Sequence, residues 1–358
     1  MQLSKFIIIL TLFFSIIPSI SAAQDKSDPN EVLLYRTPEE RRDAGIKYEL
    51  TDWLTAAGLI ELEYETERLS LRDSPKHSYQ DQKSGTIQAA LEANPTDWFL
   101  GEFVYEYELN TGDHLVEEAV AIIEIENLGF EFGKMEVPFG EYYSYFIRGP
   151  ILEFGETRGT GGVISYDFDD AAEISAFIYE GRSKQLNSTY DNLDWGLALE
   201  SKALPWGTTG ISFISDLADS TEDFLIDQGF KHKKRVPAIS AFTTTSFKSF
   251  DLTIEYVGAI KSFEDLDNKV NNPKAWNFEI ARNITDEVLI AYRLEGSKEL
   301  EDTPKLSTGL SFSWRANEHL LISLDCLHDW YDRGLANDTN EREISKGYTV
   351  IGQISFGL

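Results

Sequence analysis

The residues of this sequence that could do chemistry are mainly carboxylates, and several recur at nearly every second position. In an extended strand, residues two apart point to the same side. Like charges held this close raise one another's pKa unless cations lie between them. The pattern predicts an acidic face that selects cations or binds divalent ions, with a solvated polar face without a specific ligand as the alternative. The two sets are Glu61, Glu63 and Glu65, and Glu102, Glu106 and Glu108.

A second group of polar side chains lies in the segment 133–162, which reads GKMEVPFGEYYSYFIRGPILEFGETRGTGG. The segment separates two alternating runs, but it is too long for a turn and too aromatic for a plain surface loop. Its glycines, with Pro138 and Pro150, permit sharp turns. The candidate solute-facing residues are Glu136, Glu141, Tyr142, Tyr143, Arg148, Glu153, Glu156 and Arg158.

Catalysis is not predicted. None of the five histidines falls in a metal-ligand spacing such as H-E-x-x-H, and the sequence contains no G-x-S-x-G. With 61 acidic residues, some paired carboxylates arise by chance. We therefore expect no catalytic residue, no cofactor and no metal site.

The chain begins with the features of a cleavable signal peptide over residues 1–23. Lys5 precedes an apolar run at 6–17, and Ser21, Ala22 and Ala23 offer small residues for cleavage. The apolar run is shorter than the roughly 20 residues that span a bilayer. Residues 24–50 read as a short periplasmic lead-in with a possible short helix near Thr37, and residues 51–358 as the main domain.

The formal net charge of −29 excludes nucleic acid as a natural partner. The single cysteine, Cys326, cannot form a disulfide within the chain. Stability must therefore come from burial and from backbone pairing.

The segments that must position these residues alternate with a period of two. At 305–315, Leu306, Leu310 and Phe312 share one face, and serines occupy the other. Segments of about ten residues suit tilted strands that cross a bilayer, so the pattern predicts an all-β, antiparallel transmembrane barrel. We expect sixteen strands, at 53–65, 84–94, 97–109, 115–126, 128–134, 159–168, 172–180, 192–201, 207–216, 235–247, 249–260, 273–283, 286–296, 305–315, 318–328 and 346–357.

The connections alternate between short and long, as in bacterial outer-membrane barrels with short periplasmic turns and long extracellular loops. The expected long links are 66–83, 135–158, 181–191, 217–234, 261–272, 297–304 and 329–345, with the shorter 110–114 as an exception. Tryptophans such as Trp53, Trp98 and Trp330 lie near strand ends, where aromatic girdles at the membrane interfaces belong.

Several stretches resemble the LbtU-family siderophore porins. They are RRDAGIKYELTDWLTAAGLIELE at 41–63, KMEVPFGEYY at 134–143 with LEFGETRGT at 152–160, IEYVGAIKSFE at 254–264 and NPKAWNFEIA at 272–281. The resemblance covers about 41–358. It implies an outer-membrane barrel of a Gram-negative bacterium, linked to iron uptake by passage of iron–siderophore complexes without an energy-coupling plug domain.

With this strand count, 135–158 is the third extracellular connection, which general porins fold back into the pore. We therefore expect it to form a constriction, with an external lid or a contact with a neighbouring subunit as the alternative. Many ferric siderophores are anionic and would be repelled by an acidic mouth. The basic run KHKKR at 231–235 could offset this by gathering anions, or it could be a solvated patch.

The sequence thus predicts a passive, substrate-preferring outer-membrane channel for iron–siderophore complexes. A general diffusion porin for small hydrophilic solutes is one alternative, and a non-conducting surface barrel that binds a partner through its loops is another. The expected partners are outer-membrane lipid and the transported solute. General porins are often trimers, so a homo-oligomer is a further expectation, by analogy of fold alone.

Overall fold

The structure of this protein, a computed structural model, describes residues 47–168, 171–181, 193–204, 207–220, 234–247 and 249–357. Within these ranges, the side chains of residues 153 and 202–204 are not described. The expected signal peptide and residues 24–46 of the expected lead-in lie outside the described residues.

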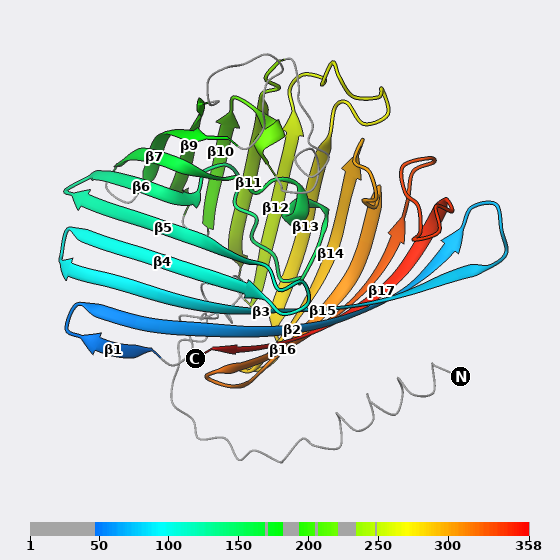
Figure 1. Ribbon diagram of the computed structural model, residues 1–358, viewed down its shortest axis with the longest axis horizontal. Coiled ribbons are helices and arrows are strands. Elements are labelled where there is room, and N and C mark those ends of the chain that lie inside the picture. Colours follow the sequence, from blue (N-terminus) through cyan, green and yellow to red (C-terminus); the bar gives the residue numbers. More distant parts are fainter. Residues whose placement is uncertain are drawn as a thin grey trace. The chain divides into compact units, whose positions relative to one another are not determined.

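Sixteen antiparallel strands form a closed barrel, which confirms the predicted fold class (Figure 1). Each strand pairs with the next along the chain, and the last one, β17 (Ile344–Gly357), pairs with β2 (Leu54–Leu71) to close the ring. The strands between them are β3 (His77–Thr96), β4 (Phe99–Glu108), β5 (His114–Ile125), β6 (Leu128–Glu136), β7 (Arg158–Asp167), β8 (Ala172–Glu180), β9 (Leu193–Leu204), β10 (Gly207–Ile214), β11 (Ala238–Phe247), β12 (Phe250–Ala259), β13 (Lys274–Asn283), β14 (Val288–Lys298), β15 (Leu306–Asn317) and β16 (Leu320–Trp330).

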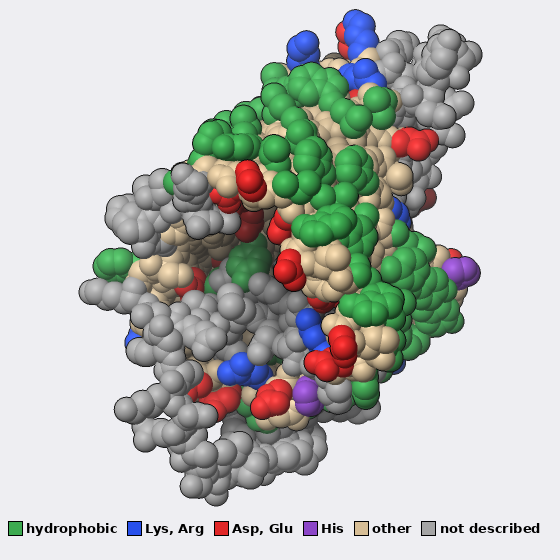
Figure 2. Space-filling model, turned by 90° about the vertical axis from the view of Figure 1, so that its left-hand side faces the viewer, with side chains coloured by type: hydrophobic (Ala, Val, Ile, Leu, Met, Phe, Trp, Pro, Cys, Tyr) green, Lys and Arg blue, Asp and Glu red, His purple; other side chains and the backbone are tan. Residues whose placement is uncertain are grey.

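The barrel is apolar on its outer surface and polar inside, which is the reverse of a water-soluble protein. On β14, Ile290 and Tyr292 point outward and are 41% and 42% exposed, whereas Arg293 and Glu295 point inward and are almost fully buried. Figure 2 shows hydrophobic side chains gathered over the outer surface of the strands. A barrel with an apolar exterior and a polar interior is the arrangement that hydrocarbon stabilises.

The connections alternate between two ends of the barrel, which we call the long-loop end and the short-turn end. Connections at the short-turn end are 97–98, 126–127, 168–171, 205–206, 248–249, 284–287 and 318–319. Those at the long-loop end are 72–76, 109–113, 137–157, 181–192, 215–237, 260–273, 299–305 and 331–343.

The first hairpin corrects one expectation. Residues 66–83 were expected to form a long loop, but β2 and β3 stay paired from Thr66↔Asp81 to Ser70↔His77, and only 72–76 connect them. Polar residues occur on both faces here, so the hydrophobic alternation fades although backbone pairing continues.

Tryptophans form two belts, as expected for a membrane barrel. Near the long-loop end lie Trp195, Trp276 and Trp330, and near the short-turn end lie Trp53, Trp98 and Trp314. Trp206 lies outside the described residues.

A short strand, β1 (Tyr48–Thr51), was not anticipated in the lead-in. It pairs with β2 from Tyr48↔Ala56 to Thr51↔Leu54. The ladder between β17 and β2 ends at Gly357↔Leu59. β1 therefore continues the pairing of β2 where β17 runs out.

Helices are minor in the described part of the chain. They are α3 (Pro150–Phe154) and the single turn η1 (Leu217–Asp219). Neither has the length or apolarity of a membrane-crossing helix.

Candidate functional site

The connection between β6 and β7 lies against the inner wall of the barrel. We call residues 137–157 the inner loop. Its backbone and side chains contact inward-facing residues of β10, β12, β13, β14, β15 and β16. Val137, Phe139 and Phe154 pack with Ile214 and Val257 of the wall in one buried cluster. The segment that was expected to form a constriction therefore lies inside the barrel.

Two wall glutamates hold the first half of the inner loop. Glu255 on β12 accepts hydrogen bonds from the backbone N–H groups of Glu141 and Tyr142, at 2.8 and 2.9 Å. Glu279 on β13 accepts from the hydroxyl of Ser144 at 2.5 Å and from the N–H of Tyr145 at 2.8 Å. Both glutamates are at most 1% exposed. Hydrogen bonds to a charged acceptor are stronger than neutral ones, so these carboxylates fix the path of the backbone.

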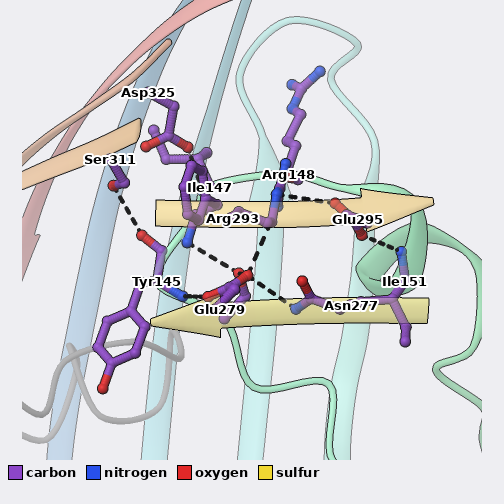
Figure 3. Close-up of polar contacts among 12 residues, drawn as sticks. Tyr145, Ile147, Arg148, Ile151, Asn277, Glu279, Arg293, Glu295, Ser311 and Asp325 are labelled. Atoms are coloured by element: carbon purple, nitrogen blue, oxygen red, sulfur yellow. Dashed lines mark hydrogen bonds and ion pairs between the residues drawn. The ribbon is translucent and has the colours of Figure 1, made fainter. Parts of the chain in front are cut away.

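Two further wall carboxylates hold the second half (Figure 3). Asp325 on β16 accepts from the N–H of Ile147 at 2.7 Å. Glu295 on β14 accepts from the N–H of Ile151 at 2.8 Å. Ile151 is in the first turn of α3, which has no side-chain cap of its own. Glu295 therefore satisfies one of the free N–H groups at the helix start.

Arg293 lies at the centre of this set and is 1% exposed. Its Nε is 3.0 Å from Glu295 Oε2, and its Nη1 donates to the backbone oxygen of Arg148 at 2.6 Å. Its guanidinium lies 4.2 Å from the ring centroid of Phe146. Arg293 thus binds the inner loop and balances part of the buried negative charge.

Arg148 reaches from the inner loop to a different part of the wall. Its Nη1 is 2.8 Å from Glu65 Oε2, and its Nη2 is 3.1 Å from Glu63 Oε2, both on β2. Glu61, on the same inward face, accepts from Ser355 at 2.6 Å. The first set of alternating glutamates therefore faces inward as expected, but each member has a protein partner, two of them the same arginine.

The side chains of the other expected residues take no part in these contacts of Arg293 and Arg148. Glu141 is exposed, although its backbone N–H is held by Glu255, and Tyr143 is half-buried. Arg158 begins β7, pairs with Glu117 and Glu156, and lies opposite Glu136 at the end of β6. The side chain of Glu153 lies outside the described residues.

The second set of alternating glutamates lies on β4, two strands from β2 and across the ring from strands that anchor the inner loop. Glu102, Glu106 and Glu108 share the inward face of β4, where Glu106 accepts from Gln88 at 2.8 Å and Glu108 accepts from Thr111 at 2.9 Å. By strand order, β4–β8 are opposite β12–β16. Charged inward positions of β6 and β8 are also glutamates, at Glu131 and Glu173. The wall that faces the inner loop is therefore acidic.

Burial shapes the electrostatics of the inner loop itself. Desolvation, and then the nearby Glu255 carboxylate, raises the pKa of the Tyr142 hydroxyl well above its ordinary value. Tyr142 therefore stays neutral over the physiological range. Among the described residues, no group of three or more His, Cys, Asp or Glu side chains is arranged to hold a metal ion.

Sequence reasoning missed Glu255, Glu279, Asp325 and Arg293 as parts of the site. A signal was present, because these charged residues occupy inward positions in the middle of strands that are otherwise apolar on the outward face. Alternation predicts that such residues face the lumen. It does not predict that they bind a loop more than 100 positions away in the sequence.

No family model matches the sequence. A UPF0422 protein from Coxiella burnetii (strain RSA 493 / Nine Mile phase I) is 30% identical over an alignment of 212 residues, with coverage of 53% of this chain and 44% of that protein. The match thus spans less than half of the relative's length, and no family membership follows from it.

Solved structures with a similar fold are outer-membrane barrels. A Salmonella typhi OmpF complex with daunomycin has a TM-score of 0.59 at 9% identity, covering 87% of this chain and 100% of that one. The anion-selective porin from Comamonas acidovorans gives 0.59 at 8% identity, covering 85% and 99%. The outer membrane channel DcaP of Acinetobacter baumannii gives 0.57 at 11% identity, covering 87% and 99%. At these identities the likeness shows that this chain has the porin-like barrel fold.

Proposed function

We propose that this protein is an outer-membrane channel through which small solutes diffuse passively, with the inner loop as its constriction. The observation that carries the proposal is the attachment of residues 137–157 to the lumen wall by Glu255, Glu279, Glu295 and Asp325. A loop held at this position narrows the passage without closing the barrel. In this proposal the long-loop end is extracellular and the short-turn end is periplasmic.

The charge of the lining argues for a preference among solutes. The anchoring carboxylates already have donors from the inner loop, whereas the glutamates of β4, β6 and β8 lie across from it. Pore selectivity follows from width and from the charge of lining groups. The channel therefore favours cations and neutral solutes over anions.

Reconstitution of the mature protein into planar bilayers tests this function. We expect discrete conductance steps in potassium chloride and a reversal potential with the sign of cation selectivity in a salt gradient. Barrels that insert but conduct no ions would contradict the channel, in favour of a surface protein that binds a partner. Anion selectivity would contradict the role of the acidic wall.

The substrate class proposed here is iron–siderophore complexes that are neutral or positively charged. The sequence resemblance to siderophore porins supports the iron complex, and the acidic wall supports the charge restriction, because an anionic chelate would be repelled on entry. General diffusion of small hydrophilic solutes is the second candidate, and the porin-like fold is compatible with both.

Blockade of the single-channel current separates these two candidates. We expect a neutral ferric hydroxamate to produce transient blocks at micromolar concentrations, and an anionic ferric citrate to produce none. Equal insensitivity to both complexes, with conduction intact, would favour the general porin. Stronger block by the anionic complex would contradict the charge argument.

A further inference from the structure

A cluster of aromatic and basic side chains lies on the outer face of the barrel, at the long-loop end of β16, β17, β2 and β3. Backbone register places His328, Tyr348, Arg68 and Tyr79 side by side in one row across these four strands. The next row toward the loops contains Trp330, Lys346, Ser70 and His77. We call Arg68, Tyr79, His328, Trp330, Lys346 and Tyr348 the outer patch.

The aromatic rings of the outer patch are already ordered against one another. The ring centroids of His328 and Tyr348 are 4.2 Å apart with an interplanar angle of 11°, and those of His328 and Trp330 are 3.9 Å apart. Tyr348 and Tyr79 are still 51% and 64% exposed. Flat, exposed ring faces with polar edges suit a ligand that is apolar on one side and polar on the other.

The charge of the outer patch is opposite to that of the chain as a whole. Neither row contains a carboxylate, although the protein has 61 acidic residues and a net charge of −29. Arg68 and Lys346 are exposed, and within the described ranges neither forms an ion pair. The nearest acid on this face of β3 is Asp81, two residues from Tyr79 toward the membrane. Two cations left without acidic partners mark a position for an anion.

We propose that the outer patch binds the phosphorylated sugar headgroup of a glycolipid in the outer leaflet. This inference rests on the proposed outer-membrane location. Arg68 and Lys346 would contact phosphate, which arginine binds with two parallel hydrogen bonds. The exposed face of Tyr348 would pack on the sugar ring. Trp330 sets the depth, because tryptophans at strand ends lie at the level of the lipid headgroups.

A second outward-facing pair of cations provides a matched control. Lys274 on β13 and Lys298 on β14 are register partners at the long-loop end, close to Trp276. Lys298, however, forms an ion pair with Glu299 at 3.0 Å. Within the described residues, no pair of stacked rings like that of His328 and Tyr348 lies beside these two lysines. If charge alone bound the lipid, the two positions would be equivalent.

The test uses the full mature protein in detergent and native mass spectrometry with defined lipids. The probes are diphosphoryl lipid A, monophosphoryl lipid A and phosphatidylglycerol. For the double variant Arg68→Gln, Lys346→Gln, we expect about tenfold or greater loss of affinity for diphosphoryl lipid A, because both cations near the lipid surface attract its phosphates. The Lys274→Gln, Lys298→Gln variant should bind as the unmodified protein does. Tyr348→Leu should weaken lipid A more than phosphatidylglycerol.

Each outcome decides the proposal. No retention of lipid A by the unmodified protein, or equal loss in both double variants, overturns it. Equal effects of every variant on lipid A and phosphatidylglycerol overturn the recognition of a sugar. A changed oligomeric state with unchanged lipid binding assigns the outer patch to a contact between copies of this chain. Channel conductance, measured on the same variants, should be unaltered, so failure of lipid binding is distinguishable from failure of the channel.

Discussion

Glu255 and Glu279 hold the first half of the inner loop, so loss of their charge should loosen it. In a Glu255→Gln, Glu279→Gln variant, each amide nitrogen replaces an acceptor oxygen with a donor. At Glu255 one backbone N–H of the loop then lacks its acceptor, because the carboxylate now accepts from two of them. At Glu279 the hydroxyl of Ser144 can turn to accept from the new amide, so there the loop exchanges a charged acceptor for a neutral one. The wall shape is preserved, since Glu and Gln have nearly the same volume.

The size of the effect follows from the lost hydrogen bonds. A buried donor without a partner costs about 1–3 kcal/mol, so the substitution at Glu255 weakens the attachment by about this amount, and the loss of the charged acceptor at Glu279 adds to it. Since each 1.4 kcal/mol is a factor of ten, the lower figure already shifts the equilibrium between attached and released loop by about fivefold. Glu295, Asp325 and Arg293 still hold the second half.

Single-channel recording is the assay. We expect the variant to switch between the ordinary conductance and a larger one, with increased current noise. Asp251→Asn is the matched control, because Asp251 lies on the same inward face of β12 but accepts from Ser246 at 2.5 Å rather than from the inner loop. A double variant that conducts with the amplitude and noise of the unmodified protein would refute the reasoning.

Four further predictions have shorter tests. Arg148→Gln frees Glu63 and Glu65 of their cation, so the reversal potential in a salt gradient should move toward stronger cation selectivity, and a move toward anions would contradict this. Gly149→Ala places a Cβ against the buried guanidinium of Arg293, so it should release the loop and increase current noise, whereas quiet recordings would count against the clash. Leu310→Arg puts a charge on the lipid face, where Leu310 is 56% exposed, and should cost about 2–4 kcal/mol of folding into vesicles; Ser313→Arg, on the inward face, should cost much less. The hydrogen bonds from Arg342 lower the pKa of Asp338, so loop 331–343 gains stability that is fully present above the unfolded value of about 3.9 and lost as the pH falls further. The protection factors for hydrogen exchange there should stay constant from pH 5 to 7 and fall only in stronger acid. Arg342→Gln should lower them without removing them, because the backbone N–H groups of Asn340 and Arg342 still donate to Asp338.

Alternation, together with the length of the segments and the order of short and long connections, was enough to predict the barrel and the direction of most side chains. The inward face of Glu61, Glu63 and Glu65, the outward face of Leu310 and the two belts of tryptophan follow from a period of two and from strand ends. These properties are local, because a strand places successive side chains on opposite faces whatever it pairs with. The prediction from the sequence was wrong at 66–83. There β2 and β3 stay paired beyond the apolar band, so hydrophobic alternation no longer indicates the strands.

The environment of the charged residues was decided only by tertiary structure. The spacing of Glu63 and Glu65 indicated two like charges, but not that Arg148 would lie 3.1 and 2.8 Å from them. Likewise, Glu255 and Asp325 bind backbone groups 114 and 178 positions away. Such contacts depend on closure of the ring and on the path of a loop with few regular hydrogen bonds of its own. A strand's periodicity carries no information about which distant backbone will fill the space that its side chains enclose.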